Sequence, residues 1–364
     1  MEKIENILRN FLFYKQSFYF FEKKFIILFS TVRELCKAED SRNFRRLEKD
    51  DKERACTGSN EKEQVDMIPA GFWFHYKSDY TVQQMIDEHM KLFRTTDMDI
   101  VKIMQDYPYP ISGKITCADD WYHIQVKGTD SEEFAKMAEI IRGIRKEAGK
   151  DVLIFQTMFG PFKAASMTFG DDVLMKYSKE APEAVAAGVK IIADALEEWT
   201  KGYLEAGADG IYYSAQFGEI GRFEKNEWEE LVRPYDLQIL KVAEEMPEKY
   251  NILHICGEPE YQFETHVEWF KNYPADLINW SVKDNHFSLE QGRELYSSAI
   301  LGGMNNKGNV LNGSEDAIRE EVKGILDAFG TKGIMIGADC TIQGENISLD
   351  LIKTAVEAAH AYKK

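Results

Sequence analysis

The chain has 364 residues, of which 44% are hydrophobic and 29% are charged, and its formal net charge is −17. This length and hydrophobic content allow a large core, arranged as two ordinary domains or one large α/β domain. The acidic balance argues against nucleic acid or an anionic membrane as the main partner. An odd count of five cysteines, with no secretory signal, predicts reduced thiols in a cytoplasmic protein.

Residues 1–50 precede the regular pattern of the chain. An aromatic-rich stretch from Phe11 to Phe29 lies in this region, and charged residues such as Lys15 and Glu22 interrupt it. The stretch is therefore too short and too charged to span a membrane, and no cleavage site of a signal peptide follows it. We expect a peripheral helical extension and assign it no function.

From about residue 51 onward, short apolar runs alternate with segments of helical periodicity. The runs are too apolar to leave one face of a strand in water, which is typical of parallel sheets. The predicted strands are, in chain order, residues 71–76, 99–104, 151–156, 210–214, 251–256, 277–281, 299–304 and 333–337.

Helical patterns follow these runs. After the fifth strand, apolar residues spaced by four and three predict a helix over residues 261–273. Ser288, with Gln291 three residues later, is typical of a capping box that opens the helix after the sixth strand. Ser314 opens another amphipathic helix, which we expect to end at Gly330.

Eight strand–helix units predict the α/β class and a (β/α)8 TIM barrel over residues 51–364. The structural rival is an open doubly wound sheet, which usually has fewer units and a glycine-rich phosphate loop after its first strand. No G-x-G-x-x-G motif follows the first predicted strand, and this favours the barrel.

Three residues near strand ends indicate a metal site. His254 and Cys256 are two positions apart on the fifth predicted strand, so their side chains point to the same face. Cys340 follows the eighth strand, and the carboxyl ends of barrel strands meet on one rim. One imidazole and two thiolates suit zinc, and three ligands leave a fourth position open, as in catalytic sites. The structural alternative is two buried cysteines and a core histidine.

Zinc would hold a substrate thiol as its thiolate at neutral pH. Two cysteine thiolates also donate charge to the metal, which keeps a bound sulfur nucleophilic. This ligand set therefore favours alkylation of a thiolate over activation of water.

The segments 253–257 and 337–342 resemble the H-x-C…C zinc signature of corrinoid-dependent methyltransferases in the uroporphyrinogen decarboxylase superfamily. Further similarity around residues 52–69 and 302–314 extends the resemblance over about residues 50–364. It implies a (β/α)8 barrel and places the zinc ligands at the same histidine and two cysteines. It also implies methyl transfer between a cobalamin on a separate corrinoid protein and a small methylated substrate or thiol at the zinc.

The chain departs from the true decarboxylases of that superfamily. Those enzymes resemble one another in an arginine-rich segment near the first strand, whereas residues 68–77 contain no arginine. The chain also lacks a D-x-H-x-x-G cobalamin signature. The nearest match, residues 87–92, has no glycine, so we expect His89 to be an exposed helix residue and the cobalamin to come on the partner protein.

Other polar and aromatic residues near the predicted strand ends are candidates for the substrate pocket. They are Trp73, His75, Gln156, Tyr213, Gln216, Trp280, Asp284 and Asn305. The aromatic members would suit an aryl or quaternary ammonium methyl donor. Asp284 would orient a ligand histidine or cap its own loop. Glu219 is a candidate for a displaceable fourth zinc ligand, and the alternative is a carboxylate at a helix start.

The leading functional prediction is a zinc-dependent methyltransferase that works with a corrinoid protein. One alternative is a uroporphyrinogen decarboxylase-type lyase of tetrapyrrole biosynthesis, which predicts no metal and a basic pocket. The other is a non-catalytic barrel that binds a corrinoid protein. It predicts that loss of zinc leaves partner binding intact.

Overall fold

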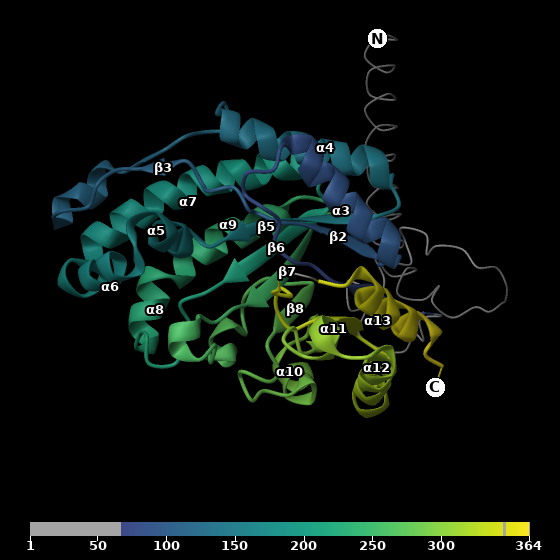
Figure 1. Cartoon of the computed structure of the whole chain (residues 1–364). Coiled ribbons are helices and arrows are strands. Elements are labelled where there is room, and N and C mark those ends of the chain that lie inside the picture. The colour runs from purple at the N-terminus through teal and green to yellow at the C-terminus, as the bar shows by residue number, and fades with distance from the viewer. Residues whose placement is uncertain (1–66, 345–346, 364) are drawn as a thin grey trace, which may run out of the picture. The chain divides into compact units, whose positions relative to one another are not determined.

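Eight strands form one parallel sheet in the part of the chain that the structure, a computed structural model, describes: residues 67–344 and 347–363. The strand order is β1-β10-β9-β8-β7-β6-β5-β2. The end strands β1 and β2 also contact each other, so the sheet curls into a nearly closed barrel (Figure 1). The predicted (β/α)8 barrel is confirmed, while the predicted extension of residues 1–50 lies outside the described residues.

All eight predicted strands are present. The first is shorter than expected, because only two of its residues join the ladder, although Phe74 also pairs with Ile342 in an isolated bridge. The barrel strands are β1 Ala70–Gly71, β2 Ile100–Ile103, β5 Leu153–Phe159, β6 Gly210–Ala215, β7 Tyr250–Ile255, β8 Leu277–Trp280, β9 Ala299–Met304 and β10 Ile334–Ala338.

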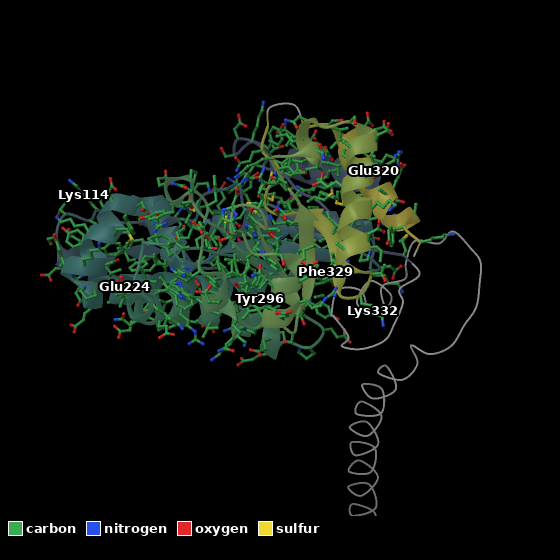
Figure 2. The ribbon with its side chains drawn as sticks, turned by 90° about the horizontal axis from the view of Figure 1, so that it is seen from below. Lys114, Glu224, Tyr296, Glu320, Phe329 and Lys332 are labelled. Carbon is green, nitrogen blue, oxygen red and sulfur yellow. The ribbon has the colours of Figure 1, made fainter. Side chains whose placement is uncertain are left out.

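Helices form the outer layer of the barrel, with α3 packed on α4, α4 on α7, α7 on α9, α12 on α13 and α13 on α3 (Figure 1). Exposed charged side chains such as Lys114, Glu224 and Lys332 cover the outer surface (Figure 2). In the described part of the chain, no helix combines the length and the apolar character that a membrane crossing requires. The helices are α3 Val82–Thr96, α4 Glu132–Ala148, α5 Pro161–Phe169, α6 Asp171–Glu180, α7 Pro182–Glu205, α8 Lys225–Leu231, α9 Arg233–Glu245, α10 Leu289–Leu295, α11 Asn309–Asn312, α12 Glu315–Phe329 and α13 Leu349–Ala361.

The strands separate two apolar layers, because successive side chains of a strand point to opposite faces. One buried cluster takes residues from every strand or its end and fills the barrel interior: Trp73, Ile100, Met104, Leu153, Phe155, Tyr212, Ile252, Leu277, Ala299, Leu301 and Met335. The residues between them on the strands, such as Ile154, Tyr213 and Leu253, belong to the larger cluster beneath the helices. A side chain's position in the strand alternation therefore decides whether it can reach the barrel mouth.

Three helix ends follow the sequence prediction closely. The side chain of Ser288 accepts a hydrogen bond from Gln291 N in a complete capping box, and Ser314 and Gly330 cap the two ends of α12. These local rules succeed because a cap needs only residues within one helical turn.

The prediction of a helix over residues 261–273 is wrong. Two short 3-10 turns, η2 Pro259–Tyr261 and η3 Val267–Phe270, replace it. Gln262 and Phe263 adopt positive φ angles of 57° and 62°, which an α-helix does not allow. A small antiparallel pair, β3 Ile111–Ser112 with β4 Gln125–Val126, also lies between β2 and α4 and was not predicted.

Candidate metal centre

The three predicted zinc ligands come together at the carboxyl ends of β7 and β10. His254 lies on β7, Cys256 directly follows it, and Cys340 lies two residues beyond β10. The Sγ of Cys340 is 3.4 Å from His254 Nε2 and 4.0 Å from Cys256 Sγ. All three ligand atoms lie within 4.8 Å of one another, and the described residues contain no other such group of three or more histidine, cysteine or acidic ligands.

These distances fit a tetrahedral zinc ion. Usual zinc bond lengths place two sulfur ligands about 3.8 Å apart, and a sulfur and a nitrogen about 3.5 Å apart. The observed separations of 4.0 and 3.4 Å need only small adjustments. The donor set, with one imidazole and two thiols, is also one that zinc prefers over magnesium or calcium.

Backbone hydrogen bonds fix both cysteine positions. Cys256 N donates to Ala215 O at 2.9 Å, which continues the β6–β7 ladder beyond the last strand residue. Asp339, next to Cys340, donates its backbone N–H to Met304 O at 2.8 Å, and its carboxylate accepts bonds from Gly303 N and Val282 N. The cysteines are therefore held by the sheet rather than by free loops.

The two thiols are electrostatically coupled. The hydrogen bond between Cys256 and Cys340 lowers the pKa of Cys340 and raises the pKa of Cys256, and the partial burial of Cys256 raises its pKa further. His254 is buried as well, with its ring 5.5 Å from that of Tyr212, and its Nδ1 has no hydrogen-bond partner among the described residues. The arrangement thus places the thiol whose pKa is lowered, Cys340, 3.4 Å from an imidazole nitrogen.

Trp73 and Gln216 are the predicted pocket residues that the structure places inside the barrel mouth. Trp73 belongs to the interior cluster. Gln216 continues the inward-facing series of Tyr212 and Ser214, is 7% exposed, and leaves its Oε1 without a partner. His75 is exposed and forms a 2.6 Å hydrogen bond with Asp106.

Tyr213, Trp280 and Gln156 do not lie at the mouth, contrary to expectation. The hydroxyl of Tyr213 donates to Asp236 on α9, and the indole of Trp280 donates to Phe287 O. Gln156 Nε2 donates to Gln105 Oε1 and Thr157 O. All three side chains point outward toward the helices, because their strand neighbours are the residues that face the axis.

Glu219 is not positioned as a fourth ligand. It is fully buried, lies outside the group of three ligands, and accepts a hydrogen bond from Arg222 at 3.1 Å. Burial raises the pKa of its carboxyl group. Glu219 and Arg222 thus form a buried ion pair, and Arg222 also forms an ion pair with the exposed Asp171.

Asp284 and Asn305 hold their own loops. Asp284 accepts hydrogen bonds from Ser281 Oγ and Lys307 Nζ, which fits the predicted alternative that it caps its own loop. Among the described residues, no carboxylate bonds His254 Nδ1, so the prediction that Asp284 orients a ligand histidine is wrong. Asn305 Oδ1 accepts from Lys307 N within a turn. Its neighbour Asn306 is buried and donates to Thr341 O, one residue after Cys340.

Sequence reasoning missed several buried polar residues of the interior. Lys102 lies on β2 between the inward-facing Ile100 and Met104, and burial lowers the pKa of its ammonium group to about 7. Tyr212 and Asn279 form an interior hydrogen bond of 3.0 Å. A lysine inside an otherwise apolar strand run was the signal that could have drawn attention to Lys102.

The prediction that His89 is an exposed helix residue is also wrong. It is 2% exposed rather than on the helix surface, and its Nε2 accepts a hydrogen bond from Met104 N. Its Nδ1 is bonded to Met85 O, so the ring connects α3 to the end of β2.

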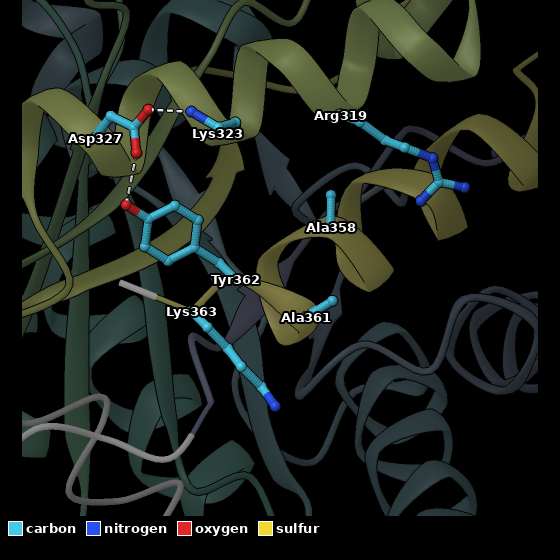
Figure 3. A pocket seen from close by; sticks show the side chains of 7 residues that line it. All are labelled: Arg319, Lys323, Asp327, Ala358, Ala361, Tyr362 and Lys363. Atoms are coloured by element: carbon cyan, nitrogen blue, oxygen red, sulfur yellow. Dashed lines mark hydrogen bonds and ion pairs between the residues drawn. The ribbon is translucent and has the colours of Figure 1, made fainter.

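Two surface grooves lie away from the ligand group. One groove, with a volume of about 690 Å³, lies between α12 and α13. There the carboxylate of Asp327 forms an ion pair with Lys323 and accepts a hydrogen bond from the hydroxyl of Tyr362 (Figure 3). The other, of about 840 Å³, is lined by residues of α7 and α9 with the adjacent Met246. Neither groove contains a residue that was predicted for the site.

A comparison with protein families matches residues 97–362 to the uroporphyrinogen decarboxylase (URO-D) model. The matched segment covers most of the chain and includes His254, Cys256 and Cys340. The chain belongs to the uroporphyrinogen decarboxylase family. Among curated members with a named activity, this URO-D protein is similar to the methylcobamide:CoM methyltransferase MtbA of Methanosarcina acetivorans. The two are 25% identical over 230 residues, which are 62% of this chain and 63%, less than two thirds, of that relative.

Solved structures with the same fold include a methyltransferase from Methanosarcina mazei. It has a TM-score of 0.67 and 18% sequence identity, and covers 85% of this URO-D chain and 97% of its own. A B12-independent methionine synthase from Shewanella sp. W3-18-1 has a TM-score of 0.55 and 11% identity, with coverage of 81% and 94%. At these identities the likeness establishes the barrel fold.

Proposed function

We propose that this URO-D protein is a zinc-dependent methyltransferase. It moves a methyl group between a corrinoid carried by a partner protein and a small substrate or thiol at the zinc. The observation that carries the proposal is the close approach of His254 Nε2, Cys256 Sγ and Cys340 Sγ at one barrel rim. The similarity to MtbA, whose name describes methyl transfer from a methylcobamide, supports the same reaction class.

The residues of this chain prepare the site for a thiol. His254, Cys256 and Cys340 would hold zinc, which when bound would lower the pKa of a thiol substrate and keep its sulfur nucleophilic. Tyr212 packs its ring against His254 and shields the imidazole from water. The His254 side chain is buried and the two cysteine side chains are half-buried, which limits the access of water to the site.

Metal analysis tests this proposal most directly. Wild-type protein purified without chelator should contain about one zinc per chain. Cys340→Ser should lose most of it, because one of the three protein ligands is removed. Cys117→Ser is the matched control: Cys117 is an exposed thiol outside the ligand group, so this variant should keep its zinc. Metal-free wild type would contradict the proposal and favour the decarboxylase-type alternative.

A second measurement separates catalysis from partner binding alone. Zinc-loaded protein should change the absorbance of methylcobalamin when a thiol acceptor is present. If the zinc-loaded protein causes no spectral change with any thiol or methylated donor, the non-catalytic barrel becomes the better account.

A further inference from the structure

A histidine–carboxylate pair lies beyond the carboxyl ends of β1 and β2. Nδ1 of His75 is 2.6 Å from Oδ1 of Asp106, and the other carboxylate oxygen of Asp106 accepts a hydrogen bond from Tyr76 N at 2.8 Å. The side chain of Asp106 is 6% exposed, whereas that of His75 is 52% exposed. A largely buried carboxylate therefore fixes the orientation of a ring that is open to water.

Both members of the pair continue the inward-facing series of their strands. His75 is two positions after Trp73, and Asp106 is two positions after Met104; Trp73 and Met104 belong to the cluster that fills the barrel interior. The residue next to the histidine, Tyr76, points the other way, with its ring packed on that of a histidine in α3. Since side chains two positions apart share a face, the alternation places the pair at the barrel mouth.

The same mouth contains the ligand group. Phe74, the residue before the histidine of the pair, forms a parallel bridge with Ile342, which is two positions after Cys340. The pKa of Lys102, which burial lowers, is raised in part by the negative charges of Cys340 and Asp106. One ammonium group is thus within electrostatic reach of both the metal group and the carboxylate of the pair.

The imidazole of His75 has an open nitrogen, because its Nε2 has no hydrogen-bond partner within residues 67–344 and 347–363. Carboxylates elsewhere on the loops of this rim are already engaged. Glu258 forms an ion pair with Lys163. Asp284 forms one with Lys307. An open imidazole nitrogen in contact with water is suited to exchange protons near neutral pH.

Thiol binding at the metal group requires an acceptor for a proton. A free thiol is mostly protonated at neutral pH, and it loses its proton when the sulfur binds a metal. The three ligand side chains cannot accept this proton, because their donor atoms would be bound to the metal. Lys102 is only 6% exposed, so it has little access to the water that must finally receive the proton. The exposed ring of His75 has that access.

We propose that His75 accepts the thiol proton at Nε2, and that Asp106 is the positioning residue that holds its ring through Nδ1. The S–H bond breaks, its electron pair stays on the sulfur, and the proton forms a new N–H bond at Nε2, which then passes it to water. Because Nδ1–H donates to the carboxylate, Nε2 is the nitrogen that accepts. The inference rests on the proposed function, since the proton comes from the thiol that this function requires.

The test measures how fast the proton is released. Zinc-loaded protein is mixed with mercaptoethanol in a stopped-flow instrument, in weak buffer that contains a pH indicator. His75→Gln should slow proton release by about 100-fold, and Asp106→Asn should slow it by about ten-fold. Neither variant should change the zinc content or the equilibrium affinity for mercaptoethanol, because a proton relay changes rates alone. A merely structural role would change the zinc content and the affinity as well.

Rescue by an added base and a matched control sharpen the comparison. His75→Gly leaves a space that opens to water, and 1,2-dimethylimidazole carries a methyl group beside its basic nitrogen that hinders metal binding. This base should speed proton release by His75→Gly in proportion to its concentration and leave the wild type unchanged. His266→Gln is the control: His266 also pairs with a carboxylate, Glu268, at 3.2 Å, but its ring stacks on Trp269. It should release the proton at the wild-type rate.

The equilibrium binding of the thiol, measured beside the kinetics, separates this inference from the proposed function. If His75→Gln binds mercaptoethanol and releases the proton at the wild-type rate, the proton relay is overturned and the proposed function stands. The same holds if the added base does not speed release by His75→Gly. If zinc-loaded wild type binds no thiol, the proposed function fails, and the relay that depends on that thiol fails with it.

Discussion

The Sγ atom of Cys340 lies 3.4 Å from Nε2 of His254, although 86 positions separate the two residues in the chain. Strands β8 and β9 lie between β7 and β10 in the sheet order, so it is the curvature of the barrel that brings the two strand ends together. The grouping of His254, Cys256 and Cys340 therefore depends on the closed barrel. The amount of zinc bound per chain should depend both on these three side chains and on an intact barrel.

Glu219→Gln should retain the zinc content of the wild type. The carboxylate of Glu219 lies outside the ligand group and is engaged by Arg222. Zinc per chain, measured on protein purified without chelator, checks this expectation. A loss comparable to that of Cys340→Ser would show instead that Glu219 reaches the metal in solution.

Arg222→Met should destabilise the protein by about 3–5 kcal/mol, because it leaves the buried carboxylate of Glu219 without its counter-charge. Both side chains are almost completely buried. Urea denaturation measures the change. The double variant Glu219→Gln/Arg222→Met should be more stable than Arg222→Met alone, and a wild-type-like Arg222→Met would contradict the importance of the pair.

Asp236→Asn should change how stability depends on pH. Burial raises the pKa of Asp236 from 3.8 to about 7, although the hydroxyls of Tyr213 and Tyr273 donate to it. The native state therefore favours the protonated carboxyl group of Asp236. The stability that this preference contributes is present near pH 4 and is lost as the pH rises to above 7. The free energy of unfolding of wild type relative to Asp236→Asn should fall by roughly 2–4 kcal/mol over that window. Parallel pH profiles for the two proteins would refute it.

Two glycine-to-alanine substitutions in helices should have opposite effects. A Cβ at Gly292 of α10 would lie 2.1 Å from the Trp280 ring, so Gly292→Ala should destabilise by about 1–3 kcal/mol. A Cβ at Gly324 of α12 meets nothing within 4 Å, so Gly324→Ala should stabilise by about 0.5–1 kcal/mol. Thermal denaturation of both variants checks the pair, and equal shifts would contradict the packing around Trp280.

The sequence by itself determined the strands of the barrel and the ligand group. Runs such as residues 251–256 are apolar on both faces, and this pattern has few solutions other than a buried parallel strand. The two-residue spacing of His254 and Cys256 then fixed their common direction, because the side-chain period of a strand is two. Helix caps such as Ser314 were equally readable from local residues.

Only the tertiary structure decided which strand face points to the axis. In strands that are apolar on both sides, Tyr212 and Tyr213 look alike in sequence, yet one lines the interior and the other contacts α9. The barrel packing makes that choice through contacts between distant strands. The same holds for the burial of Glu219 and Lys102, which follows only from the elements that enclose them in the folded chain.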